Sequence, residues 1–152
     1  MNEGISSFTQ DLLFMLSELI QLSFDKIMQT RSYTVVILKG QGKKFAIYTD
    51  PAIGRNLQIF LTGAEKARPL THDLISYIFR GYEIRIKQVV INDIQDTTYF
   101  ARLFLEQDAG VRRHIVEIDA RPSDCITLAL MNNAPVFCTR EVLEKTLAIE
   151  EE

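Results

Sequence analysis

The sequence predicts one α+β domain that contains an internally duplicated β-β-β-α-α motif, a mostly antiparallel sheet and an N-terminal helix. Three observations predict this fold class. The composition is that of an ordinary globular chain, since 47% of the 152 residues are hydrophobic and 24% are charged. Segments with strand patterns come in two groups of three, and helical periodicity follows each group. The two groups also align with each other.

Strands are indicated where apolar residues alternate, or where β-branched and aromatic residues run together between turn residues. In chain order these segments are 19–28, 33–39, 45–49, 82–94, 98–106 and 114–119. A shorter strand is expected at 135–138, between the last two helices.

Helical periodicity is found in four segments. The segments, with the apolar residues that indicate them, are 51–62 (Leu57, Leu61), 71–80 (Leu74, Ile75, Ile78, Phe79), 121–132 (Ile126, Ala129, Leu130) and 140–147 (Val142, Leu143, Leu147). Thr71 is the expected N-cap of the second helix.

The two halves of the chain align in their helices as well as in their strands. Leu57 falls on Ile126, and Leu61 falls on Leu130. Each half would leave an open sheet edge and a bare apolar face, so two copies can cover each other around a shared core. We therefore predict an internal duplication, and we expect that neither half folds alone.

Three regions are predicted along the chain. Residues 1–17 form an amphipathic helix that packs on the body or on a second subunit, so a homo-oligomer is expected. Its apolar stripe consists of Phe8, Leu12, Leu13 and Leu16. Residues 18–148 form the domain, and 149–152 form an acidic tail.

Charge and hydropathy argue against a strongly basic nucleic-acid binder and against a membrane-spanning protein. The formal net charge is −3, and the three glutamates at 150–152 account for it. The body is therefore neutral, and contacts with nucleic acid should be weak and local. We expect a cytoplasmic protein without a membrane span, because no apolar run is long enough and no basic lead-in resembles a secretory signal. Cys125 and Cys138 lie in apolar runs and are expected to be buried thiols.

The densest polar cluster lies at 117–124, where a strand leads into a helix. Alternation places Glu117 and Asp119 on one strand face, about 7 Å apart, and Asp124 follows in the first helical turn. We expect these carboxylates to converge with Arg121. Such a group could hold a divalent cation, Mg²⁺ or Mn²⁺, for phosphodiester cleavage while Arg121 contacts the phosphate. The alternative is structural: Asp119 and Asp124 pair with Arg121 and stabilise the helix start.

A second cluster spans 68–73, at the start of another helix. His72 could act as a general base or metal ligand beside the Asp73 carboxylate, with Arg68 just upstream. The alternative is a capped helix start with a surface histidine.

A third feature is the alternation of aromatic residues with Arg102. Phe100, Arg102 and Phe104 share one strand face, where they could stack nucleic-acid bases. The alternative is a core face on which Arg102 pairs across the sheet.

Together these segments resemble the bifunctional nuclease family. The resemblance covers residues 18–147, and DARPSD at 119–124 is its most specific motif. The other matching segments are 61–63, 68–75, 96–103, 125–126 and 134–136. The resemblance implies nuclease activity on DNA and RNA, aided by a divalent metal, in a domain of mixed α and β structure.

This chain departs from the family pattern at two places. Ile53-Gly54 stands where the family carries a Glu-Ala pair, so a carboxylate is missing. Thr97 replaces a turn glycine, the residue best suited to positive φ.

The leading hypothesis is a nuclease. The candidate catalytic residues are His72, Asp73, Asp119 and Asp124, the candidate substrate-binding residues are Arg68, Arg102 and Arg121, and the candidate metal ligands are Glu117, Asp119 and Asp124. The main alternative is a non-catalytic, oligomeric binding or regulatory module, which the neutral body and the missing carboxylate favour. A third hypothesis is a hydrolase that acts on small nucleotides.

Overall fold

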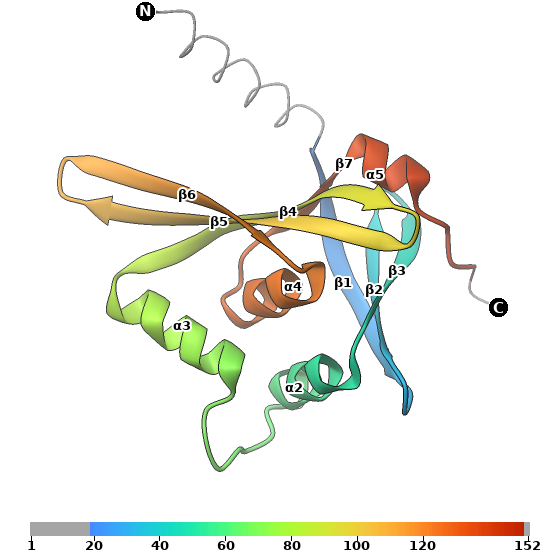
Figure 1. The fold of residues 1–152 in the computed structure, drawn as a ribbon, viewed down its shortest axis with the longest axis horizontal. Coiled ribbons are helices and arrows are strands. Elements are labelled where there is room, and N and C mark those ends of the chain that lie inside the picture. The colour runs from blue at the N-terminus through green and yellow to red at the C-terminus, as the bar shows by residue number, and fades with distance from the viewer. Residues whose placement is uncertain (1–18, 151–152) are drawn as a thin grey trace, which may run out of the picture.

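The computed structural model describes residues 19–150, which form a seven-stranded sheet and four helices (Figure 1). The strands are β1 (Leu19–Gln29), β2 (Thr34–Gly40), β3 (Lys43–Thr49), β4 (Ile84–Gln95), β5 (Thr98–Ala109), β6 (Arg112–Ala120) and β7 (Val136–Thr139). The helices are α2 (Pro51–Thr62), α3 (Thr71–Gly81), α4 (Pro122–Met131) and α5 (Arg140–Lys145). The mixed α and β, mostly antiparallel architecture predicted from the sequence is confirmed.

The strand order across the sheet is β3-β2-β1-β7-β4-β5-β6. Within each half, consecutive strands pair antiparallel as a three-stranded meander. Strand β7 lies between the two meanders, antiparallel to β1 and parallel to β4. The shortest strand of the sheet therefore joins the two halves.

Local sequence explains where the helices begin and end. Asp50 caps α2, because its Oδ1 accepts a hydrogen bond from the Ile53 amide at 3.0 Å. Gly63, at φ 66°, ends that helix in the left-handed conformation. The predicted N-cap of α3 is wrong by one residue, since Leu70 occupies that position and its amide donates to Asp73 Oδ2 at 2.8 Å.

Helices α2, α3 and α4 lie on one side of the sheet, and α5 lies on the other side along β4 and β7 (Figure 1). The core forms where α4 packs on β4 and β5, with Ile126 of the helix and Val89 and Leu103 of the strands among its buried members. Cys125 and Cys138 are free and buried, as predicted. Burial raises their thiol pKa values to about 12 and about 11, respectively.

Both halves have three strands followed by a helix, but their later elements differ. The two helices of the first half are joined by the loop 63–70, whereas β7 separates α4 from α5 in the second half. The duplication therefore stays a prediction. The predicted helix at 1–17 and the end of the predicted acidic tail lie outside the described residues. None of the helices between residues 19 and 150 is long and apolar enough to cross a membrane.

Candidate functional site

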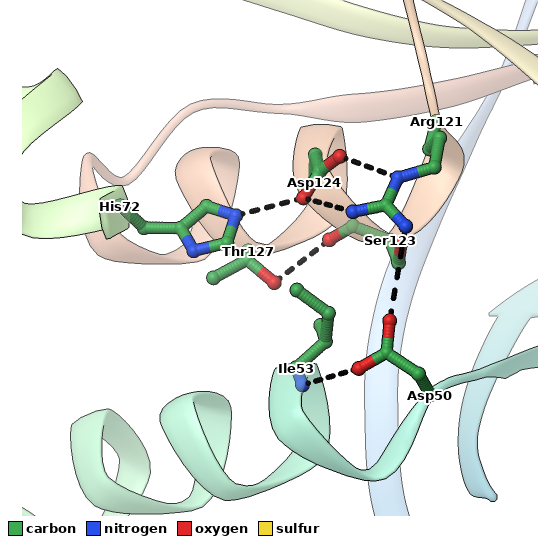
Figure 2. Close-up of polar contacts among 7 residues, drawn as sticks. All are labelled: Asp50, Ile53, His72, Arg121, Ser123, Asp124 and Thr127. Atoms are coloured by element: carbon green, nitrogen blue, oxygen red, sulfur yellow. Dashed lines mark hydrogen bonds and ion pairs between the residues drawn. The ribbon is translucent and has the colours of Figure 1, made fainter. Parts of the chain in front are cut away.

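The starts of α3 and α4 meet through a hydrogen bond between His72 and Asp124 (Figure 2). His72 Nε2 lies 3.0 Å from Asp124 Oδ1, and Arg121 Nε donates to Asp124 Oδ2 at 2.8 Å. His72 and Asp124 come from two different polar segments that the sequence singled out. The structure therefore brings these two segments together at one carboxylate.

Arg121 also reaches a carboxylate of the first half of the chain. Its Nη1 atom lies 3.7 Å from Asp50 Oδ2, while the other oxygen of Asp50 caps α2 (Figure 2). Asp50 is not among the site residues predicted from the sequence. The sequence does contain a signal for Asp50. Asp50-Pro51 and Arg121-Pro122 begin helices that follow corresponding meanders, so the two residues have equivalent places in the two halves.

These contacts set the charges of the group. Burial alone would raise the pKa of Asp124, but hydrogen bonds from Arg121 and His72 outweigh it and hold that pKa below its usual value. The hydrogen bond to Asp124 raises the pKa of the Arg121 guanidinium. At neutral pH the group therefore holds an ionised carboxylate against a fixed positive charge.

An open cleft of about 410 Å³ lies beside this group, between β3, the β4–β5 turn and the start of α4. It is lined by Ile47, Tyr48, Thr49, Asp50, Thr97, Thr98, Tyr99, Arg121, Pro122 and Ser123. The Arg121 side chain is 63% exposed, whereas that of His72 is 5% exposed. Arg121 can therefore contact a ligand directly, and His72 can act only through Asp124.

The start of α4 differs from the starts of α2 and α3. Carboxylates hydrogen-bond to the amides at those two helix starts, Asp50 at α2 and Asp73 at α3. Helix α4 has Arg121 at its N-cap position, and no side chain of residues 19–150 caps it. The first amides of a helix have no partner within the helix and carry partial positive charge. Together with Arg121 they make this end of α4 suitable for an anion.

Asp73 does not take part in this group. Both of its oxygens lie 2.6 Å from Lys66 Nζ, and it also accepts the Leu70 amide. Burial would raise the pKa of Asp73, but the hydrogen bonds from Lys66 and Leu70 lower it overall. Asp73 therefore secures the start of α3, and the partner of His72 is Asp124.

Glu117 and Asp119 lie on the opposite face of the sheet from Asp124. Asp119 pairs in register with Arg102, while Ala120 pairs with Ala101 on the face that α4 covers. The expected convergence of Glu117, Asp119 and Asp124 is therefore wrong. Between residues 19 and 150 no group of three potential metal ligands forms.

The carboxylates that do meet are Asp50 and Asp124, and the Arg121 guanidinium lies between them (Figure 2). A cation would have to bind where Arg121 now lies, so these residues do not fit a metal site as arranged. The divalent cation stays a prediction.

The two remaining candidate arginines lie away from the cleft. Arg102 Nε is 3.7 Å from Glu117 Oε1, which agrees with the alternative that Arg102 pairs across the sheet. Arg68 lies exposed in the loop between α2 and α3 and does not line the cleft. By contrast, Thr97 does line it, and the positive φ of the β4–β5 turn falls on Asp96, at 57°.

Comparison with known proteins identifies the family. The model of the bifunctional nuclease domain matches residues 35–151, which include Asp50, His72, Arg121 and Asp124. The chain belongs to the bifunctional nuclease domain family. It is also similar to two curated proteins of Mycobacterium tuberculosis, Uncharacterized protein Rv1829 of strain H37Rv and Uncharacterized protein MT1877 of strain CDC 1551. Each is 35% identical over 81 residues, which cover 53% of this chain but only 45% of the relative.

The structure accounts for one departure of this chain from the bifunctional nuclease pattern. A Cβ atom added to Gly54 would lie 2.0 Å from Thr34 Oγ1, so the alanine of the family's Glu-Ala pair does not fit this backbone. Ile53 at the preceding position is buried. The first turn of α2 is therefore packed against β2 at a place where the family pattern has a carboxylate.

Proposed function

We propose that this chain binds a phosphodiester of DNA or RNA in the cleft beside Arg121 and hydrolyses it. The observation that carries the proposal is the combination of an exposed arginine and an uncapped helix start at one open cleft. Membership of the bifunctional nuclease domain family supports the choice of a nucleic acid over other anions.

Each part of the cleft offers a different contact to such a substrate. Arg121 and the first amides of α4 suit a phosphate oxygen. The hydroxyl groups of Thr49, Thr97 and Thr98 can donate hydrogen bonds to the nucleic-acid backbone, and the exposed Tyr48 offers a ring on which a base can stack. Tyr99 lines the same cleft, but its own ring is stacked on Phe45. Because the body of the chain is neutral, binding relies on these local contacts rather than on a broad basic surface.

Asp50 is the carboxylate that lines the cleft, so it is the group best placed to orient an attacking water there. Asp124 does not line the cleft; its lowered pKa keeps it ionised, and it holds the Arg121 guanidinium in place. His72 is a positioning residue, since its buried ring holds one oxygen of Asp124 while Arg121 holds the other. Arg121 in turn stabilises the charge that develops on the phosphate.

The test is a cleavage assay of the full chain on single-stranded DNA, double-stranded DNA and RNA, with Mg²⁺, with Mn²⁺ and with chelator. Arg121→Ala should lower the rate at least about 100-fold, which corresponds to about 2.7 kcal/mol. Arg80→Ala is the matched control, because Arg80 lies in the last turn of α3, at the end away from His72. This variant should cleave at the wild-type rate. Loss of cleavage in chelator would show that a divalent cation takes part.

A second candidate is a binding module that does not cleave. The observation in its favour is that Ile53 and Gly54 occupy the place of the family's Glu-Ala pair, so the carboxylate of that pair is missing. Such a module would bind labelled oligonucleotides through Arg121 and leave them intact under every metal condition. That result would contradict hydrolysis but would still support the binding site at Arg121. A wild-type chain that neither binds nor cuts would contradict both.

A further inference from the structure

Strand β6 is a sheet edge of a kind that isolated domains rarely leave open. It is the last strand of the sheet, and its other side pairs with no strand between residues 19 and 150. Its nine residues are exposed except for the half-buried Ala120. They include Ile115, Val116 and Ile118, which are 52%, 50% and 39% exposed. A long, exposed edge with apolar side chains is a template for pairing with another chain.

The opposite edge of the sheet, at β3, is covered by the chain itself. The Ile149 amide donates to the Lys44 carbonyl at 2.8 Å, and Lys43 Nζ donates to the Leu143 carbonyl at 2.6 Å. The segment after α5 therefore occupies part of the β3 edge. Among residues 19–150, the edge left uncovered is β6, one strand of the β5–β6 hairpin that extends from the body in Figure 1.

The charges along β6 indicate what covers it. The strand begins with the basic Arg112 and Arg113 and ends with the acidic Glu117 and Asp119. An antiparallel copy of the same strand places the basic end of one chain against the acidic end of the other. The edge is thus complementary to itself, as a two-fold interface requires.

We propose that β6 pairs antiparallel with β6 of a second copy of this chain, centred on Val116, the midpoint of the strand. Every pair in this register joins side chains of the same face, so the sheet continues from one subunit into the other. Arg113 lies opposite Asp119 of the partner subunit, and the two Val116 side chains meet at the axis. A register centred on Glu117 would place two carboxylates opposite each other, which is unfavourable.

The lack of an ion-pair partner at Asp119 among the described residues fits the same arrangement. Between residues 19 and 150, Asp119 makes no ion pair, although Arg102 is its register partner on β5. Arg113 already contacts Glu106 at 2.8 Å on its own subunit. The dimer gives Asp119 a cation from the second chain. It also brings Arg112 of the partner subunit beside Ala120, next to the cleft. The dimer itself does not depend on the proposed function.

Val116→Lys tests the edge directly, because it places two lysines opposite each other at the axis. Val116 is half exposed, so the folded subunit can accept the substitution. Val111→Lys is the matched control, since it adds the same charge to the same hairpin outside the strand. Sedimentation should give a dimer for the wild type and Val111→Lys, and at least an about tenfold weaker dimer for Val116→Lys.

A charge exchange tests the register. Arg113→Asp and Asp119→Arg each place like charges opposite each other across the interface, and the double variant restores opposite charges. We expect a weaker dimer for each single variant and recovery in the double variant. Thermal unfolding confirms that each variant is folded, and Asp119→Arg is the more informative single change because Arg113 also holds Glu106.

Three results would overturn the proposal. A monomeric wild-type chain excludes the dimer, and a dimer that Val116→Lys leaves intact must use another surface. A folded double variant without recovery excludes pairing centred on Val116. None of these results depends on nuclease activity, so failure of the interface and failure of the proposed function are distinguishable.

Discussion

At the scale of single residues, Asp124 connects parts of the chain that lie far apart in sequence. It accepts hydrogen bonds from His72 of α3 and from Arg121 before α4, and Arg121 extends the group to Asp50. Sequence spacing identified Asp124 and Arg121 as neighbours. It did not identify His72 or Asp50 as their partners, because those contacts arise only when the two halves pack.

The low pKa of Asp124 predicts how its contribution to stability depends on pH. A carboxyl group whose pKa is lowered by folding stabilises the protein above its unfolded pKa, about 3.9, and loses that contribution as the pH falls through its folded pKa. Asp124→Asn should therefore reduce the free energy of unfolding by about 1 to 3 kcal/mol at pH 7. The difference from the wild type should shrink toward pH 3.

Urea unfolding at pH 7 and pH 3 measures this difference. Asp96→Asn is the matched control, because Asp96 is exposed and asparagine accepts its positive φ. It should change the unfolding free energy by less than about 0.5 kcal/mol at either pH. A cost of Asp124→Asn that stays constant between the two pH values would contradict an ionised, hydrogen-bonded Asp124.

At the scale of elements, the sequence predicted the order and type of every described strand and helix. The residues that share a strand face were also predictable, since alternation correctly groups Glu117 with Asp119. Alternation says nothing about the direction in which the chain turns after Ala120. Helix α4 turns to the face opposite those two carboxylates, and for this reason the predicted cluster of three does not form.

The packing of α2 on β2 gives a prediction at the same scale. Gly54 contacts Thr34, whose Oγ1 is buried and lacks a hydrogen-bond partner among the described residues. Gly54→Ala would ordinarily favour a helix by up to about 1 kcal/mol. Here the added methyl group must displace Thr34, so we expect a net loss of about 1 to 3 kcal/mol.

Thermal or urea unfolding of Gly54→Ala checks this prediction. Thr34→Ser in the same background removes the second close contact, Thr34 Cγ2 at 2.6 Å from the added Cβ, and should restore part of the loss. An unchanged or more stable Gly54→Ala variant would show that α2 can move away from β2 without cost.

At the scale of the whole molecule, β7 makes the two halves depend on each other. It comes from the second half, yet one of its edges pairs with β1 of the first half and the other with β4. Helix α4 likewise contacts α2 and α3 of the first half. The sequence predicted that the halves need each other, but the arrangement that joins them depends on a four-residue strand whose pairing partners no local pattern specifies.

Splitting the chain between α3 and β4 tests this dependence. The fragment 1–81 would leave β1 without β7, and would leave the buried side chains of α2 and α3 without α4. The fragment 82–152 would leave one edge of β7 unpaired and would expose the buried Cys138, Ile126 and Ala129 on its open side. Such exposure loses about 25 cal/mol of stabilisation for each Å² of apolar surface, and a domain is stable by only about 5 to 15 kcal/mol.

For this reason neither fragment should unfold cooperatively by itself. An equimolar mixture of the two should regain a cooperative thermal transition, measured by circular dichroism. A cooperative transition in either fragment alone would show that a half of this chain is an independent folding unit.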